Sequence, residues 1–225
     1  VIVVDEFHHA EAPTYRKILE HFKPKELLGL TATPERGDSV DVKEAFFDGR
    51  AAAEIRLWDA LAADLLVPFH YFGISDNTDL SEIAWNSRKG SYEPSELTRV
   101  YTGESGRLRA GIIGKSLKDK VTSVGSMRAL GFCATVDHAR FMTDEFNAMG
   151  ILSRLVVGET SREERSESIA ALKRGDVRCL FTVDVFNEGL DIPQIDTVLM
   201  LRPTQSSTIF LQQLGRGLRR APRKS

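Results

Sequence analysis

The sequence predicts an α/β protein built from parallel sheets in two units. Short runs that are apolar on both faces alternate with segments whose apolar residues recur at helical spacing. Such runs are typical of strands that helices cover on both sides, which is the usual setting of a parallel sheet. The alternation breaks from about residue 75 to residue 106, where polar sequence with Gly and Pro predicts a hinge or mobile connection between the units.

Length and composition are those of an ordinary globular protein. The 225 residues suffice for one large domain or two modest ones, and the formal net charge of −2 gives no argument for a polyanionic partner. No apolar run approaches the roughly 20 residues that span a membrane. Cys133 and Cys179 lie in apolar runs, as expected of core thiols in a reducing compartment. We therefore expect a soluble, cytoplasmic protein with no membrane partner.

The first unit is predicted to begin with a buried strand at residues 1–4. A helix opened by Pro13 follows, and a second strand is expected within residues 25–34, where an apolar run ends in hydroxyl residues. The runs AEIRL (residues 53–57) and VPFHYFGI (residues 67–74) predict two further strands. The helix carries one apolar stripe, formed by Tyr15, Ile18, Leu19 and Phe22.

The second unit is more regular. Strands are predicted within residues 129–134, 153–157, 178–183 and 196–201, and the helices between them have clear end signals. One runs from about Val136 to Gly150. The next has Ser161 and Glu164 as a capping box and Gly175 as its stop, with Ile169 and Leu172 facing inward. A helix with Leu108, Ile112 and Leu117 precedes the first of these strands.

Chemically suggestive residues follow the predicted strands. Asp5 and Glu6 come directly after residues 1–4, Thr31 and Thr33 follow the second strand, and residues 184–191 follow the run RCLFTV. Ligands of open parallel sheets bind at the carboxyl ends of the strands. Adjacent carboxylates there cost desolvation and repulsion, which indicates a role such as holding a cation and handling a proton. A simple strand-to-helix cap is the alternative for this pair.

These stretches resemble the motifs of superfamily 2 helicases. DEFH resembles motif II in its DExH form, TATPER motif III, ALGFCATVDHA motif IV, DVFNEGLDIP motif V and QQLGRGLRR motif VI. The branch that this sequence resembles includes the translocating subunit of type III restriction enzymes. The resemblance implies tandem RecA-like lobes: part of a first lobe at residues 1–75, truncated in its N-terminal half, a connection at residues 76–105, and a second lobe at residues 106–225, truncated at its end.

The resemblance also implies ATP and Mg²⁺ as cofactors. Asp5 would hold Mg²⁺ through its water shell, and Glu6 would orient or deprotonate the water that attacks the γ-phosphate. His8 would connect the nucleotide site with motifs III and VI. Thr31 and Thr33 would couple the ATP state to the gap between lobes, although a hydroxyl turn before a proline also explains them.

Further roles fall in the second unit. Gly189 and Asp191 would approach the nucleotide and its ribose, with a glycine-containing turn as the alternative. Gln212 would contact ATP, and Arg216 and Arg219 would stabilise the transferring phosphoryl group. Because both arginines follow a glycine on a polar segment, we expect them on the surface. Nucleic-acid phosphates are expected at Thr160, Ser161 and Thr182, although helix capping alone explains Ser161.

A P-loop, G-x-x-x-x-G-K-S/T, does not occur in the sequence. GIIGKS (residues 111–116) lacks the spacer between glycines and follows motif II. We therefore expect a missing N-terminal half of the parent chain to supply the P-loop, and this piece alone to be inactive. The predicted partner is DNA or RNA, bound with little sequence preference. The alternative is a non-catalytic nucleic-acid-binding or partner-binding module derived from a helicase core in a restriction or repair complex.

Overall fold

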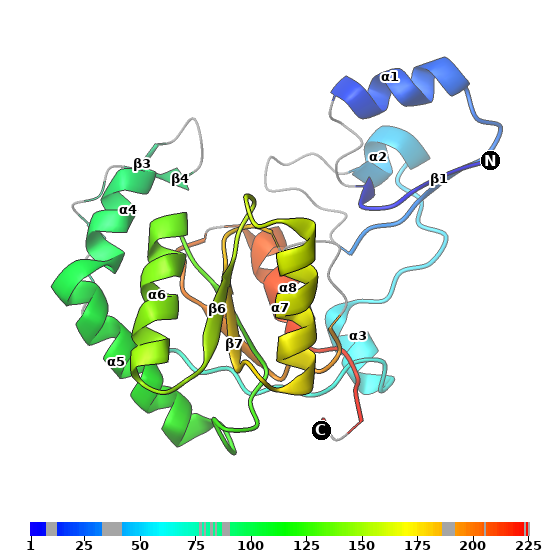
Figure 1. Ribbon diagram of the computed structural model, residues 1–225. Coiled ribbons are helices and arrows are strands. Elements are labelled where there is room, and N and C mark those ends of the chain that lie inside the picture. The colour runs from blue at the N-terminus through cyan, green and yellow to red at the C-terminus, as the bar shows by residue number, and fades with distance from the viewer. Residues whose placement is uncertain are drawn as a thin grey trace.

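A computed structural model describes residues 1–7, 13–32, 42–76, 78, 80–81, 83, 85–86, 91–185, 192–204, 206–222 and 224. Three sheets are formed by these residues, and the two parallel ones lie in different halves of the chain (Figure 1). None of the described strands joins the two halves into one sheet. The prediction of an α/β protein with parallel sheets in two units is confirmed.

The first half contains a small two-stranded parallel sheet. Strand β1 (Ile2–Val4) pairs with β2 (Leu27–Gly29), with Ile2 opposite Leu27. Helix α1 (Pro13–Phe22) connects them, and α2 (Val42–Phe47) follows. The core beneath is centred on Phe7, whose ring packs edge-on against Phe46 with centroids 5.2 Å apart. A Cβ at Gly29 would lie 2.5 Å from the Phe7 ring, so only glycine allows this close approach.

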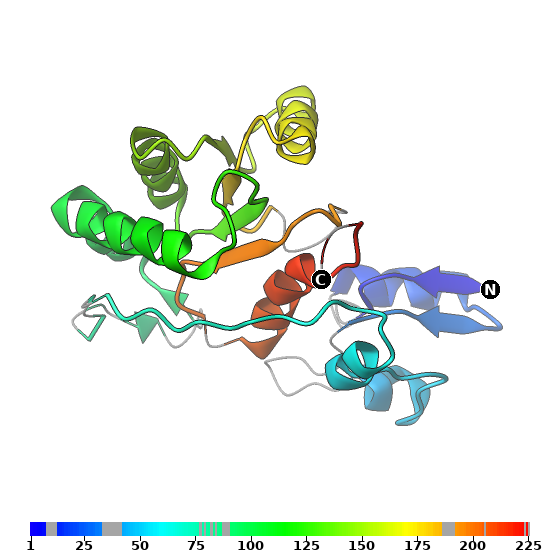
Figure 2. The same ribbon diagram turned by 90° about the horizontal axis from the view of Figure 1, so that it is seen from below.

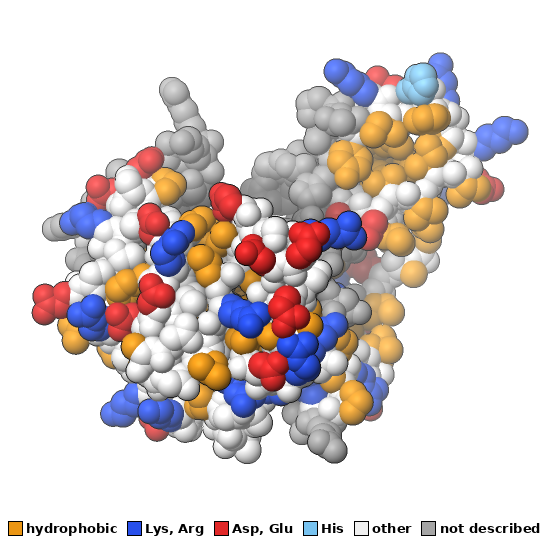
Figure 3. Space-filling model, in the orientation of Figure 1, with side chains coloured by type: hydrophobic (Ala, Val, Ile, Leu, Met, Phe, Trp, Pro, Cys, Tyr) orange, Lys and Arg blue, Asp and Glu red, His pale blue; other side chains and the backbone are white. Residues whose placement is uncertain are grey.

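Much of the apolar surface of the first half is exposed. The side chains of Val3, Leu28 and Leu30 are 56%, 43% and 46% exposed, and they alternate along the chain with half-buried residues. On α1, the predicted stripe is only partly buried: Leu19 joins the core around Phe7, whereas Phe22 is 65% exposed. Figure 3 shows apolar side chains gathered at the upper right, over the part of the chain that holds α1 and β1.

The two strands predicted after residue 50 are wrong. Residues 53–56 have no regular structure, and α3 (Leu57–Ala62) begins at the last residue of the first predicted strand. Residues 67–74 pair with no strand of the described chain. Some of their side chains contact helices instead, as with Tyr71, which contacts Phe210 of the second half edge-on at 6.2 Å. Val67 is buried, but Tyr71, Phe72 and Ile74 are 66%, 48% and 45% exposed, so the apolar run indicated neither strand pairing nor full burial.

The second half is built on a four-stranded parallel sheet with the order β6-β7-β5-β8. The strands are β5 (Ala129–Phe132), β6 (Ser153–Val156), β7 (Cys179–Thr182) and β8 (Thr197–Met200). Helices α5 (Gly103–Lys120) and α6 (Val136–Ala148) cover one face, with Phe146 packed edge-on against Phe181 at 4.8 Å. Helices α7 (Arg162–Arg174) and α8 (Ser207–Gly217) cover the other (Figure 1).

The local signals of the second half are confirmed in detail. Helix α7 has the predicted capping box, in which Ser161 Oγ accepts from the amide of Glu164 at 3.2 Å, and it ends at Gly175 with φ +86°. Gly150 follows α6 with φ +78°. Cys133 and Cys179 are buried free thiols. On α5, however, Leu117 is buried but Leu108 and Ile112 are exposed.

Between the halves, the predicted connection contains regular structure. Strands β3 (Trp85–Asn86) and β4 (Ser91–Tyr92) form an antiparallel pair, and α4 (Pro94–Tyr101) leads directly into α5. Leu97 and Tyr101 of α4 are buried in a cluster with Ile83, beside Ala134 of the second half. The domain boundaries at residues 75 and 106, and the role of this region as a hinge, stay predictions. No helix of the described chain is long and apolar enough to cross a membrane.

Candidate functional site

The pair Asp5-Glu6 lies immediately beyond the carboxyl end of β1. The amide of Glu6 donates to Asp5 Oδ1 at 2.9 Å, so the two residues form a tight local turn. Glu6 has φ +49°, a conformation that costs energy for any residue with a side chain and that clusters at functional sites. Asp5 is exposed, whereas the next residue, Phe7, is buried in the core. The buried ring therefore anchors a turn that presents the carboxylates.

Thr31 lies at the same edge of the first sheet. Val4 is opposite Gly29 in the β1–β2 register, and the amides of Leu30 and Phe7 continue the pairing at 2.9 Å to Val4 and 2.8 Å to Leu30. Residue 31 is thus beside the Asp5-Glu6 turn, as the motif order predicts. The predicted residues His8 and Thr33 lie outside the described residues.

In the second half, the carboxyl edge of the sheet carries an ion pair that the sequence analysis missed. Arg202, just after β8, pairs with Asp184, just after β7. Asp184 has φ +57°. The signal was available, because an arginine directly after a buried strand is placed at the same edge as the residues following β7. Gly189 and Asp191 lie outside the described residues.

Helix α8 carries the predicted arginine set. Ser206 caps it, accepting from the amide of Ile209 at 3.3 Å, and Gln212 is half-buried on it. The expectation that both arginines are on the surface is wrong for Arg216, which is 9% exposed near the C-terminal end of α8; Arg219 is half-buried. The polar composition of this helix end did not indicate the burial of Arg216.

Lys224 contacts the backbone of two predicted motifs, V and VI. Its Nζ donates to the carbonyl of Arg219 at 2.8 Å and to that of Pro193 at 3.2 Å. Burial lowers the pKa of Lys224 to about 8, with the charge of Arg219 adding to the shift and that of Asp196 opposing it. The lysine thus joins the last residue of the predicted motif V to the backbone of motif VI.

The residues predicted to meet nucleic acid have internal roles in this structure. Thr160 Oγ1 accepts from the amide of Val157 at 2.9 Å, and Ser161 caps α7. Thr182 has no exposed surface. The shallow depression of about 600 Å³ beside the start of α7 also carries Glu163 and Glu167. The three predicted contacts stay predictions.

The donor set of Asp5 fits Mg²⁺. Magnesium in nucleotide sites keeps most of its waters and takes one or two carboxylates together with phosphate oxygens. An exposed carboxylate at a strand end satisfies that requirement. Within the part of the chain that is described, no cluster of three or more acidic, His or Cys residues could hold a metal by itself. Asp5 is the described residue that would hold such an ion.

Comparison with known proteins supports the motif assignments. Residues 115–221 match the helicase conserved C-terminal domain, and residues 1–36 match the res subunit of type III restriction enzymes. A 51.5 kDa protein of a Lactococcus phage is 28% identical over all of this chain and 47% of its own length. The putative ATP-dependent helicase IRC3 of Saccharomyces cerevisiae is 27% identical over 97% of this chain and 32% of its own length.

Solved structures show the same fold. The ATP-dependent Type ISP restriction-modification enzyme LlaBIII, bound to DNA, superimposes with a TM-score of 0.65 at 17% identity, over 99% of this chain and 17% of the enzyme. A Saccharomyces cerevisiae Dbp5 bound to RNA and ADP BeF₃ gives a TM-score of 0.53 at 15% identity, over 95% of this chain and 49% of that chain. The two parallel sheets are therefore those of tandem RecA-like lobes.

Fold and motifs together resemble those of helicase cores. The chain is similar to the superfamily 2 helicases, in the branch related to the type III restriction enzymes, as the two family models that match its ends indicate. It spans about half the length of the phage relative and a third of the yeast one.

Proposed function

We propose that this chain is the part of an ATP-dependent DExH helicase or translocase that supplies the motif II carboxylates and the motif VI arginines. The observation that carries the proposal is the Asp5-Glu6 turn at the carboxyl end of β1, beside Thr31 at the end of β2. Carboxylates on such an edge suit a phosphoryl-transfer site. The buried free cysteines are in keeping with a cytoplasmic location.

Each residue of the set would act on a different part of the reaction. Asp5 would hold Mg²⁺, which neutralises charge on the phosphates when it is bound. Glu6 would hold the attacking water and accept its proton, which requires a carboxylate within hydrogen-bond reach of that water. Arg216 and Arg219 would stabilise negative charge on the transferring group, and Gln212 would contact the nucleotide. His8, Thr33, Gly189 and Asp191 are proposed members on motif grounds alone.

A phosphate cradle would come from a P-loop segment that the 225 residues do not contain. The exposed apolar face formed by Val3, Leu28 and Leu30 supports a further first-lobe segment packed there. We propose that such a segment, from the same parent chain, completes both the sheet and the ATP site. Residues 1–225 alone would then have no ATP turnover.

Nucleic acid is the proposed macromolecular partner, DNA or RNA. A translocase must bind the repeating backbone, so affinity should be largely independent of sequence and strongly weakened by salt. The second candidate is a non-catalytic nucleic-acid-binding or partner-binding module, which the absence of a P-loop sequence favours for these residues taken alone.

Binding measurements separate the two candidates. The protein extended by a P-loop segment ahead of residue 1 is titrated with single strands of two unrelated sequences, from low to physiological salt, with and without Mg²⁺-ATP. The enzyme proposal expects similar affinity for both sequences, a steep fall with salt and a change of affinity with nucleotide. Nucleic-acid binding whose affinity does not change with nucleotide would support the non-catalytic module. Binding that depends on sequence and does not change with salt would contradict the enzyme proposal.

A further inference from the structure

One segment runs from the first half along the second half, and we call it the strap (residues 64–76). In Figure 2 it leaves α3 and extends beside β8, α5 and α8. At its start, the amide of Val67 donates to the carbonyl of Leu218 at 2.9 Å, just beyond the end of α8. The guanidinium of Arg220 donates to the carbonyl of Asp64. The strap is therefore fixed to the C-terminal end of α8.

Aromatic residues continue this attachment along the strap. Tyr71 contacts Phe210 of α8, with ring centroids 6.2 Å apart. The next residue, Phe72, has the Nζ of Lys120, the last residue of α5, 5.2 Å from its ring centroid. Successive side chains of an extended segment point to opposite sides. The strap thus lies between α8 and α5 and contacts both.

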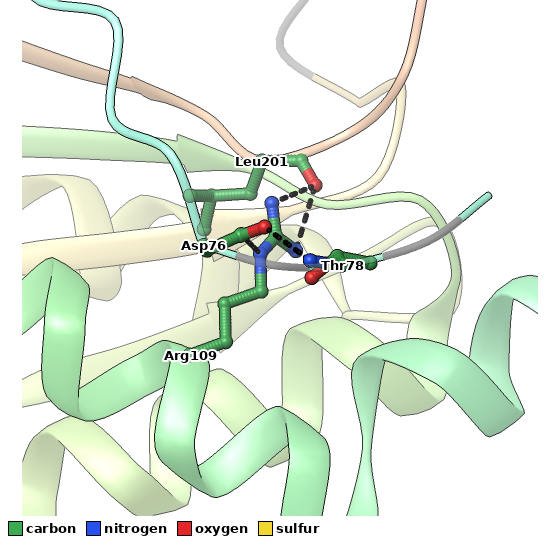
Figure 4. A network of polar contacts seen from close by, with 4 residues as sticks. All are labelled: Asp76, Thr78, Arg109 and Leu201. Atoms are coloured by element: carbon green, nitrogen blue, oxygen red, sulfur yellow. Dashed lines mark hydrogen bonds and ion pairs between the residues drawn. The ribbon is translucent and has the colours of Figure 1, made fainter.

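At its far end the strap is held by Arg109 of α5 (Figure 4). Its guanidinium forms an ion pair with Asp76, and these side chains are only 14% and 17% exposed. The same guanidinium lies 4.3 Å from the ring centroid of Tyr101. Burial by itself would raise the pKa of Asp76, but hydrogen bonds from Thr78 and Arg109, with the charge of Arg109, hold that pKa below its ordinary value. The ionised pair is therefore the stable form at neutral pH.

Arg109 also reaches the connection that leads into α8. Its Nη1 and Nη2 lie 3.4 and 3.5 Å from the carbonyl oxygen of Leu201, the residue after β8. The following residue, Arg202, is itself paired with Asp184. The strap thus links the two ends of α8. Val67 contacts the residue after its C-terminal end, and Asp76 binds Arg109, which also contacts Leu201 ahead of the N-terminal end of α8.

We propose that Arg109 is a positioning residue for α8, acting through Asp76 and the Leu201 carbonyl. A planar guanidinium is suited to this role because it can bind a carboxylate and a carbonyl at once, which an ammonium group does less well. Its last step rests on the proposed function: an α8 held at both ends would keep Arg216 and Gln212 where the γ-phosphate reacts. Small displacements of such groups cost rate rather than substrate binding.

Hydrogen exchange tests the positioning role without any ATP turnover. Arg109→Gln in the 225-residue chain should speed exchange about tenfold in residues 67–76 and 201–217, since a hydrogen-bonded charge is removed. Residues 153–174 on the far side of the sheet should be unchanged. Arg107→Gln is the matched control, because Arg107 lies on the same helix and pairs with Glu145 at 3.1 Å, away from the strap. It should leave both segments unchanged.

Two further results make the test decisive. If Arg109→Gln does not fold, Arg109→Lys keeps the charge and should give a smaller release of the same two segments. Uniform loss of protection, or unchanged α8, would overturn the inference. In the protein extended by a P-loop segment, Arg109→Gln should lower kcat for ATP about tenfold with KM unchanged. If the unsubstituted extended protein shows no turnover, the proposed function fails, and the exchange result still decides the positioning role.

Discussion

The sheets of the two halves are both parallel, but they differ in how completely helices cover them. In the second half, every residue of β5 and β7 is buried, and separate apolar clusters lie on the two faces. In the first half, the strands alternate between half-buried and exposed residues, and the core is centred on Phe7 and Val42. The second half therefore buries its central strands within itself, whereas the first half leaves an apolar face exposed.

This difference separates stability from chemistry. The carboxylates of Asp5 and Glu6 lie on the first half, whose apolar residues are less buried. Arg216 and Arg219 lie on the second half, which has the larger core. Substitutions that affect the proposed reaction should therefore act from either half, whereas those that unfold the protein should act mainly from the second.

The largest expected effect is on ATP turnover. Arg219→Ala in the protein extended by a P-loop segment should lower kcat on the order of 10³-fold, because a finger arginine stabilises charge that develops only in the transition state. Arg219 is a cleaner target than Arg216, whose burial would add a loss of stability. The measurement is steady-state turnover with a thermal melt. Arg107→Ala, at an arginine of α5 that pairs with Glu145 away from the strap, is the control and should keep near-normal turnover; similar losses in both variants would remove the finger assignment.

Matched cavities should act differently in the two halves. Phe181→Ala removes a fully buried ring that contacts Phe146, and should cost about 3–5 kcal/mol in the unfolding of the second half. Phe7→Ala removes an equally buried ring but should leave that transition unchanged. Unfolding in denaturant, with hydrogen exchange as the probe of each half, distinguishes the two transitions. A single transition weakened equally by both substitutions would show that the halves unfold together.

Acid should destabilise the second half through His138. Burial, with the charge of Arg109 adding to it, lowers the pKa of His138 to about 3, while its Nδ1 accepts from the amide of Ala134 at 3.3 Å. As the pH falls, the unfolded chain takes up this proton before the folded protein does. The contribution of His138 to the free energy of unfolding is therefore complete above about pH 6.5 and is lower by about 2 kcal/mol at pH 5. His138→Gln should flatten this dependence in denaturant melts. The exposed His70→Gln should not, and an unchanged slope in His138→Gln would contradict the assignment.

The smallest effect concerns the cap of α7. Ser161→Ala removes the side chain that accepts from the amide of Glu164, and should cost about 1 kcal/mol. Ser166→Ala, at an exposed position of the same helix, should be neutral within about 0.5 kcal/mol. Thermal melts give the stability term, and nucleic-acid titration of the same variants tests the predicted phosphate contact. Loss of affinity in Ser161→Ala beyond its loss of stability would support that contact.

The regular elements of the second half could be predicted because their signals are local. The capping box at Ser161 and the glycine stops at positions 150 and 175 are short-range, and all are present. The strap could not be predicted, since its sequence has the composition of a strand and only tertiary contacts decide what it pairs with. For the same reason the sequence placed Arg216 on the surface and gave no indication of the Arg109–Asp76 pair, which joins residues far apart in the chain.

Part of the site followed from the sequence and part did not. Residues directly after strands, such as Asp5, Glu6 and Thr31, could be placed at one sheet edge because the register of a parallel pair sets that edge. Arg202 and Asp184 also follow strands of one parallel sheet and meet at one edge, but the motifs do not pair these two residues, so their ion pair was not predicted. The hydroxyls of Thr160 and Ser161 were compatible with two roles, and their local hydrogen bonds explain one of them.

The most direct test of the account is the effect of Glu6→Gln on ATP turnover and ATP binding. In the protein extended by a P-loop segment, turnover should be abolished while nucleotide binding is largely kept, because Glu6 is assigned to the water and not to the metal. Residues 1–225 alone should show no turnover with or without nucleic acid. Equal loss of binding and turnover in Glu6→Gln, or robust turnover by residues 1–225 alone, would contradict the assignment of this chain as the carboxylate and arginine part of a divided ATP site.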